Sequence, residues 1–345
     1  MIAPIRVRYP SHVRQAIVQL IGILRLARVS AAFGAVANAW FVILWSRSVE
    51  IERAPAPITD NPEWLLLAAG AVVAVGLYAF AAALNDLLDR TRDRALRRDR
   101  PLQLGQASAE TAALAIGATA LLAVLASTVF GTHAVVLTTL VALAVLAFNA
   151  LGRHVPAIGM LLLSLIYATH MLIPNFGLRF LWPVWLVMTH AIAVAGVSHA
   201  VGRKRPVLSR RAVLFAVIGW VCASYFLLTA GHRRSVGPPG EATDPSFWPT
   251  WIDPVSAIAP AVLTVLYAVV AFRRVAATGP GRRSADKVTR YGALWLSLYA
   301  CAWLYAAGAI REAFIMTGLA AAGMITMVVL RETYALIEHP AGYRR

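Results

Sequence analysis

The chain has 345 residues, of which 59% are hydrophobic and only 14% are charged. A soluble domain of ordinary composition is about half apolar and about a quarter charged, so this chain has too few polar residues to cover a water-soluble globule. The same composition excludes intrinsic disorder. Two cysteines are too few for a disulfide-stapled secreted module. The composition therefore predicts a multi-pass membrane protein.

Ten apolar segments are long enough, or nearly long enough, to cross a bilayer. A hydrocarbon core takes about 20 residues of helix, and backbone groups in lipid must bond within their own helix. The segments do not alternate apolar and polar residues as the strands of a β-barrel do. We therefore predict an all-α membrane bundle of about nine to ten transmembrane helices, with spans at 29–46, 64–88, 108–130, 132–150, 156–176, 181–201, 211–230, 254–272, 290–309 and 312–331.

The basic residues predict the orientation of the chain. If the N-terminus is cytoplasmic, 26 of the 32 lysines and arginines fall on the cytoplasmic side. This accounts for the net charge of +16 without a nucleic-acid partner. We expect a cytoplasmic segment at 1–28, amphipathic in part, a single transmembrane domain at 29–331 and a cytoplasmic tail at 332–345. The expected location is a plasma membrane or a bacterial inner membrane.

An acidic stripe lies at the cytoplasmic end of the second predicted span. At 100° per residue, Asn85, Asp86, Asp89 and Asp93 fall within an arc of about 100° on one helix. Three carboxylates on one face repel one another, and charged side chains at a membrane span are energetically costly, so their presence indicates a specific role. One explanation is a Mg²⁺ ion that holds a phosphorylated substrate. The other is a solvated helix end, on which Asp86 pairs with Arg90 and Asp93 pairs with Arg97, each four residues further along.

A resemblance to a known family bears on this choice. The run Asn85–Asp93 resembles the first aspartate-rich motif of the UbiA superfamily of intramembrane prenyltransferases. Residues 100–108 read Arg-Pro-Leu-Gln-Leu-Gly-Gln-Ala-Ser and are similar to the family's segment leading into the next helix. Asn38 in the first span and the connection at 148–159 also match the family's pattern. The resemblance covers roughly residues 20–310.

The resemblance implies a fold and an activity. It implies a helical bundle around a central cavity, in which Mg²⁺ binds an isoprenoid diphosphate. Departure of the diphosphate leaves an allylic cation, from which a polyprenyl group passes to an acceptor, often aromatic, as in lipid or quinone biosynthesis. Neutralising the diphosphate charge and excluding water are the physical requirements of this step. Asp86, Asp89 and Asp93 would then be both the catalytic and the metal-binding residues.

Further polar residues are candidates for the two substrates. For the diphosphate we expect Asn85, Arg100, Arg153, Arg203, Lys204 and Arg205. For the acceptor or the cavity wall we expect Asn38, Asn149, Tyr167, His170 and His199.

The chain departs from the family where a second aspartate motif is expected. Residues 196–206 contain no acid, and Arg203, Lys204 and Arg205 stand there instead. These cations could neutralise the diphosphate directly, since guanidinium and ammonium groups bind phosphate oxygens. Alternatively, the chain binds a prenyl lipid without cleaving it, or the charges only set the topology. A terpene cyclase of the same superfamily and a transporter also remain open.

Overall fold

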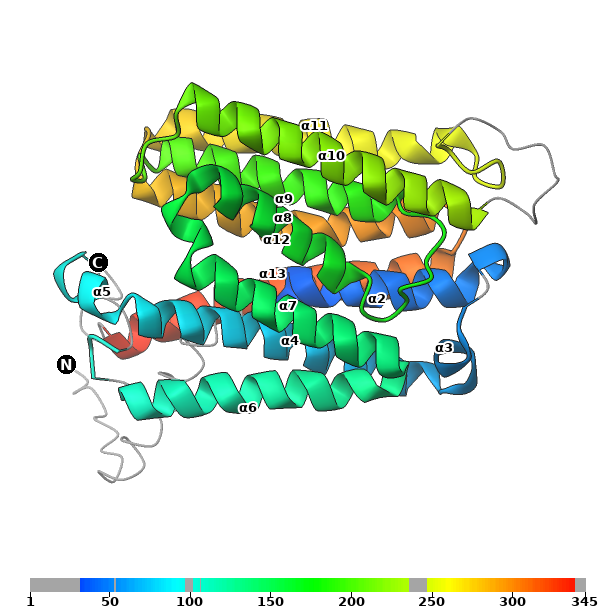
Figure 1. Cartoon of the computed structure of the whole chain (residues 1–345), viewed down its shortest axis with the longest axis horizontal. Coiled ribbons are helices and arrows are strands. Elements are labelled where there is room, and N and C mark those ends of the chain that lie inside the picture. The colour runs from blue at the N-terminus through cyan, green and yellow to red at the C-terminus, as the bar shows by residue number, and fades with distance from the viewer. Residues whose placement is uncertain (1–31, 53, 97–101, 106, 236–246, 339–345) are drawn as a thin grey trace, which may run out of the picture.

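A computed structural model describes residues 32–52, 54–96, 102–105, 107–235 and 247–338 of the chain. All regular secondary structure in these residues is helical, which confirms the all-α prediction. Ten long helices each overlap one of the ten predicted spans (Figure 1): α2 (Phe33–Ser48), α4 (Glu63–Leu88), α6 (Ala109–Ser127), α7 (Thr132–Ala150), α8 (Pro156–Met171), α9 (Trp182–Val201), α10 (Arg210–Ser235), α11 (Ile258–Thr278), α12 (Arg282–Ala306) and α13 (Ile310–Glu338).

The helix limits differ from the predicted spans at several ends, of which three are instructive. α8 ends at Met171 rather than at 176, because the chain turns before Pro174, which cannot continue a helix. α12 begins at Arg282 rather than at 290, since its polar first turns extend beyond the apolar segment. α13 continues to Glu338. Hydropathy therefore locates the apolar part of each helix but not its polar extensions.

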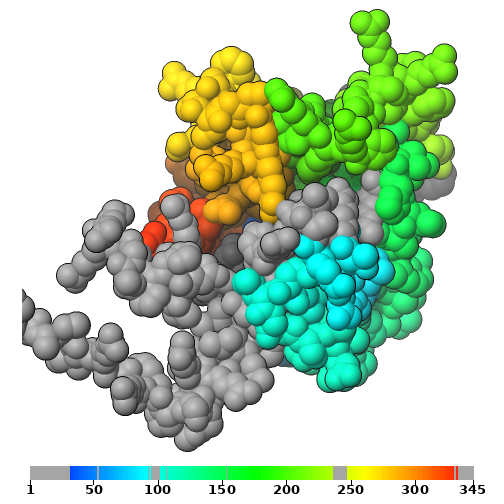
Figure 2. Space-filling view, turned by 90° about the vertical axis from the view of Figure 1, so that its left-hand side faces the viewer, coloured from blue at the N-terminus to red at the C-terminus, as the bar shows by residue number. Residues whose placement is uncertain are grey.

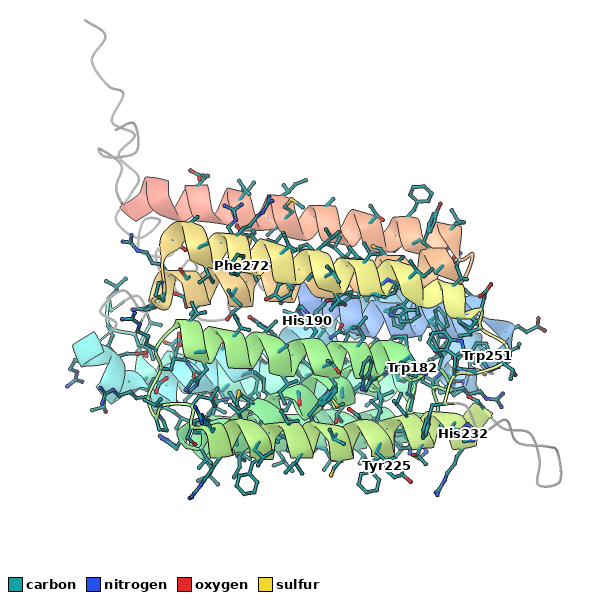
Figure 3. All side chains as sticks on the ribbon, turned by 90° about the horizontal axis from the view of Figure 1, so that it is seen from above. Trp182, His190, Tyr225, His232, Trp251 and Phe272 are labelled. Carbon is teal, nitrogen blue, oxygen red and sulfur yellow. The ribbon has the colours of Figure 1, made fainter. Side chains whose placement is uncertain are left out.

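The outer surface of the bundle is apolar. By length and composition, seven of the helices in the described residues qualify as membrane spans, and α8 is a shorter apolar helix. Leu114 on α6, Phe226 on α10 and Phe272 on α11 are each more than 70% exposed. Tyr225 lies at the outer edge of α10 (Figure 3). Lipid tails accommodate such side chains at no hydrophobic cost, so the protein is a multi-pass integral membrane protein.

The bundle has two ends, which we name after their short helices (Figure 1). At the α5 end, α4 runs into α5 (Arg90–Leu96). At the α3 end, η2 (Glu50–Glu52) and α3 (Ala56–Asp60) lead from α2 to α4. α6 lies along one edge of the bundle, and α10 and α11 lie along the opposite edge. That the α5 end faces the cytoplasm remains a prediction of the charge count.

α2 forms the centre of the bundle and packs against α4, α8, α12 and α13. Phe41, Val42 and Leu44 are fully buried. A side chain at Gly34 would collide with the backbone of Ala293 on α12, so glycine permits the close approach of these two helices.

α6 supports α4 from a face that does not line the site described below. The Thr111 amide donates a hydrogen bond of 3.0 Å to the Ser108 hydroxyl, so Ser108 caps the N-terminus of α6. Ala83 on α4 and Ala112 on α6 are both buried in one small apolar cluster. A side chain at Gly76 of α4 would come within 2.9 Å of the Thr119 carbonyl on α6. Small residues therefore fix α4 against α6.

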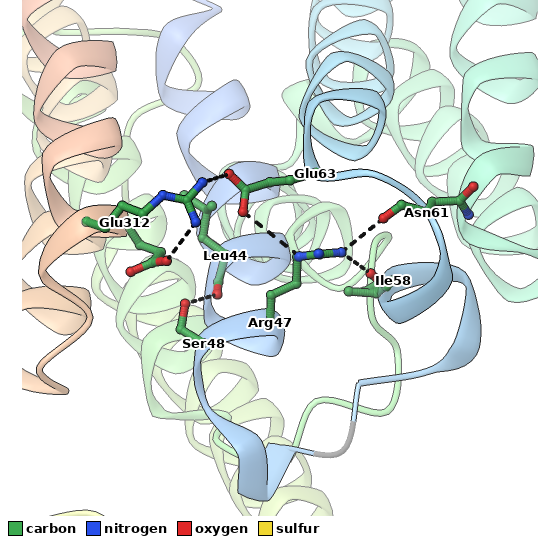
Figure 4. A network of polar contacts seen from close by, with 8 residues as sticks. Leu44, Arg47, Ser48, Ile58, Asn61, Glu63 and Glu312 are labelled. Carbon is green, nitrogen blue, oxygen red and sulfur yellow. Dashed lines mark hydrogen bonds and ion pairs between the residues drawn. The ribbon is translucent and has the colours of Figure 1, made fainter.

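Two polar clusters tie the helices together at the α3 end. In the first, Arg311 of α13 pairs with Glu63 of α4 at 2.6 Å, and Arg47 of α2 donates to the Ile58 and Asn61 carbonyls (Figure 4). The second lies beside a group of tryptophans that includes Trp182 and Trp251 (Figure 3) and is centred on a buried carboxylate.

That carboxylate belongs to Glu52, which is only 1% exposed. It accepts hydrogen bonds from the Trp45 indole at 2.8 Å and from the backbone amides of Arg179 and Phe180 at 2.8 and 3.0 Å. Burial raises the pKa of Glu52 above its usual 4.5, and these hydrogen bonds oppose that effect. Glu52 therefore holds η2 to the connection between α8 and α9.

Replacing Glu52 with alanine should destabilise the protein by about 3 kcal/mol or more, because three buried donors lose their acceptor. Thermal unfolding of the detergent-solubilised protein measures this. Glu50→Ala is the matched control, since Glu50 lies two residues away and is exposed. Equal melting temperatures for the two variants would contradict the assigned role.

The Glu52→Gln variant tests the raised pKa. Because the folded-state pKa is raised, protonation of Glu52 favours folding, and this contribution to stability is lost as the pH rises through the raised pKa. Glutamine does not titrate. We therefore expect the melting temperature of wild type to fall relative to that of the variant as the pH rises above 4.5. A pH-independent difference between the two would show that the pKa is not raised.

Candidate functional site

A cavity of about 220 Å³ lies inside the bundle between α2, α4, α7 and α8. Its α4 wall is formed by residues spaced three or four apart, which is the spacing of one helix face. Three of them, Ala74, Ala81 and Ala82, are alanines, so this face of α4 leaves space where larger side chains would fill it. The cavity therefore follows from the small side chains of α4.

The other walls are apolar in the middle and polar toward the two ends. α7 contributes Val141 and Val145 in the middle and Asn149 toward the α5 end, where Asn85 of α4 also lines the cavity. Along α8, Leu163 and Ile166 give way to Tyr167 and His170 at greater depth. The chemistry of the cavity suits a largely hydrocarbon ligand with a polar group at the α5 end.

The acidic stripe continues the cavity wall toward the α5 end. The Asp89 amide donates to the Asn85 carbonyl at 3.0 Å, and the Asp93 amide donates to the Asp89 carbonyl at 2.7 Å. These helical hydrogen bonds continue across the junction of α4 and α5, so the i, i+4, i+8 spacing of the three residues is kept. Asn85 lines the cavity, and Asp89 and Asp93 follow it one and two turns further along, beyond the residues that line the cavity.

Two carboxylates of the stripe are buried to an unusual degree for aspartate. Asp86 is 2% exposed and Asp93 is 3% exposed, whereas Asp89 is half-buried. The Asn85 amide lies 3.4 Å from a carboxylate oxygen of Asp86.

These donors fit Mg²⁺ in their chemistry. In the described ranges, no three His, Cys, Asp or Glu side chains are grouped closely enough to hold a metal by themselves. Mg²⁺ does not require such a group, because it is usually bound by one or two carboxylates together with water and substrate phosphates. Asp86 and Asp89 offer the hard oxygen ligands that such a site needs.

The basic run lies at the same end of the bundle but outside the cavity. Arg203, Lys204 and Arg205 are exposed, just beyond the end of α9. Arg203 has a φ of 48°, and the Lys204 amide donates to the His199 carbonyl at 3.2 Å, so the chain turns sharply there. Figure 2 views the protein from the α5 end, where the α4–α5, α9–α10 and α11–α12 connections lie.

Four of the predicted site residues line the cavity together: Asn149, Tyr167 and His170, which were expected there, and Asn85, which was expected to bind the diphosphate. His199 and Asn38 do not line the cavity. The His199 ring lies 2.9 Å from the Pro206 carbonyl, and Asn38 is buried within α2.

Two predicted diphosphate contacts cannot be placed. Arg100 lies outside the described residues, and the side chain of Arg153 is likewise not described.

Tyr78 is a cavity residue that sequence reasoning missed. It lies seven residues before Asn85, two helical turns away on the same face of α4. That spacing was readable in the sequence, but a single tyrosine in an apolar helix resembles any packing residue.

Comparisons with known proteins place the fold. No family model matches the chain, and no curated protein matches it in sequence. Among solved structures, that of digeranylgeranylglyceryl phosphate synthase matches with a TM-score of 0.53 at 17% identity, over 85% of this chain and 99% of that one. A UbiA homologue from Archaeoglobus fulgidus bound to GPP and Mg²⁺ matches with a TM-score of 0.49 at 14% identity, over 82% of this chain and 99% of that one. The protein therefore shares the fold of digeranylgeranylglyceryl phosphate synthase.

Proposed function

We propose that this protein is an integral membrane prenyltransferase, which transfers a prenyl group from an isoprenoid diphosphate to a small acceptor, often aromatic. The observation that carries the proposal is the position of Asn85. This residue lines the apolar cavity and also begins the acidic stripe. A hydrocarbon chain in the cavity would therefore place an attached diphosphate beside Asp86 and Asp89. The fold shared with digeranylgeranylglyceryl phosphate synthase supports the same reading.

In this proposal, each part of the site has a physical task. Asp86 and Asp89 hold Mg²⁺, and Asp93 extends the negative field one turn further. When bound, Mg²⁺ neutralises the negative charge that develops on the departing diphosphate. The apolar walls of α7 and α8 keep water away from the allylic cation, which water would otherwise capture.

The polar amides at the α5 end of the cavity orient the substrate. The Asn149 amide nitrogen donates to the Val145 carbonyl at 2.9 Å, which holds the side chain in place at the cavity wall. Asn149 is buried, and Asn85 faces the cavity from the other side. Both can offer hydrogen bonds to diphosphate oxygens as the substrate enters.

Basic residues supply the positive charge that a second metal site would provide in the family that the sequence resembles. We assign this task to Arg203, Lys204 and Arg205, with Arg100 and Arg153 assisting. The support is the charge of these residues and the location of Arg203, Lys204 and Arg205 at the α5 end. Because guanidinium forks match phosphate oxygens, such residues can bind a diphosphate without a metal of their own.

A second candidate function is binding of a prenyl lipid without turnover. The observation in its favour is the composition of the chain between Thr111 and Gly240, which contains no aspartate or glutamate. A labelled prenyl diphosphate incubated with the purified protein, MgCl₂ and mixed aromatic acceptors separates the two functions. Release of diphosphate or transfer of the label supports the transferase. Metal-dependent binding without either supports the binding protein.

Replacing Asp86 or Asp89 with asparagine should reduce prenyl transfer by about a hundredfold or more, because the leaving diphosphate loses its counter-charge. The change keeps the size of the side chain, so the melting temperature should stay close to that of wild type. Glu110→Gln is the matched control, because Glu110 is an exposed acid at the same end but not on the stripe. Undiminished transfer in both aspartate variants would contradict the metal-binding role.

Replacing Arg203, Lys204 and Arg205 together with glutamine should weaken binding of a prenyl diphosphate and reduce its dependence on salt, because three phosphate-attracting charges are lost. The control is the same change at three exposed arginines of α11 and α12 at this end: Arg273, Arg282 and Arg283. Equal affinities for the two triple variants would leave the basic run with a topological role alone. Cysteine accessibility from each side of the membrane would check the orientation of both variants.

A further inference from the structure

The cavity stops inside the bundle instead of passing through it. Along α4 it extends from Asn85 to Ala74, eleven residues or about 16 Å of helix. Beyond that depth the bundle is fully packed, since Met171, Phe41 and Trp45 are all 2% exposed or less and belong to one core cluster. A straight chain that enters from the α5 end and follows α4 therefore meets this core at the deep end of the cavity.

The volume of the cavity limits the size of that chain. Buried apolar cavities of about 150 Å³ are known to hold benzene, which has six carbon atoms. On that scale, a cavity of about 220 Å³ holds roughly nine carbon atoms. This is close to the size of a ten-carbon prenyl group and less than half that of a twenty-carbon group.

The length of the apolar section gives the same answer. Each five-carbon isoprenoid unit adds about 5 Å to an extended chain at ordinary bond lengths. The α4 wall between Asn85 and Tyr78 covers about 10 Å, which is the length of two units. Four units would reach about 20 Å, beyond the deep end at Ala74.

Polar side chains mark the end of the apolar section. Tyr78, Tyr167 and His170 all line the deeper half of the cavity. His170 is 6% exposed, and its Nε2 atom has no hydrogen-bond partner among the described residues. Because this nitrogen is already closed off from solvent, the ring is packed in place and forms part of the wall that a hydrocarbon chain meets at this depth.

We propose that the cavity accepts a ten-carbon prenyl diphosphate in preference to a twenty-carbon one, with Tyr167 and His170 forming its end wall. This inference rests on the proposed function, because it assumes that the cavity holds the prenyl group. The preference is opposite to the hydrophobic trend, in which a longer chain binds more tightly because it buries more apolar surface. An open apolar groove would therefore bind the twenty-carbon chain more tightly than the ten-carbon chain.

The test compares binding of non-hydrolysable thiolodiphosphate analogues with ten-carbon and twenty-carbon chains to the full-length protein in detergent with MgCl₂. We expect wild type to bind the shorter analogue at least about tenfold more tightly. Tyr167→Ala should bring the two affinities together or reverse their order, since it opens the end wall. Tyr167→Phe should keep most of the preference, because the bulk of the ring remains. Tyr225→Ala is the matched control, since Tyr225 is 60% exposed on the lipid-facing side of α10.

The readout separates the two proposals. Equal or tighter binding of the longer analogue by wild type overturns the chain-length inference and leaves the proposed function standing. An unchanged preference in Tyr167→Ala, with a melting temperature close to that of wild type, also overturns the assignment of the end wall. If neither analogue binds wild type, the proposed function fails, and the chain-length inference fails with it.

Discussion

The structure depends on the need to satisfy polar groups within a medium that offers no water. Almost every backbone group in the described helices bonds within its own helix, as a bilayer requires. Against this background, the few polar side chains inside the bundle stand out. At the α3 end, Glu52 is satisfied by three donors and has a structural task. At the α5 end, Asp86 and Asp93 are also buried, and Asn85 beside Asp86 lines the apolar cavity.

The cavity and the acidic stripe are two consequences of one helix. α4 turns small side chains toward α7 and α8, which creates the space, and ends with Asn85 and, at its C-cap, Asp89, after which Asp93 follows one turn further on α5. Its other faces are fixed by close contact with α6 at Gly76 and by the packing of α2. A rigid wall of this kind positions oxygen ligands more accurately than a loop would. This is why the position of the stripe relative to the apolar cavity is fixed.

Most of the fold could be predicted from the sequence, because hydropathy reports directly on helices that cross lipid. All ten long helices overlap predicted spans. The acidic stripe was also visible, since helical periodicity places its residues on one face. The cavity depth was not predictable, because it depends on how α4, α7 and α8 pack against one another. For the same reason Tyr78 was missed, and Asn38 and His199 were placed in a cavity that they do not line.

A structure of the protein with Mg²⁺ and a thiolodiphosphate analogue of a ten-carbon prenyl group tests the central claim most directly. The account predicts that the diphosphate lies against Asp86 and Asp89 through the metal, with the hydrocarbon chain following the α4 wall toward Tyr78. A ligand bound on the lipid-facing surface, or a filled cavity whose diphosphate lies away from the aspartates, would contradict it.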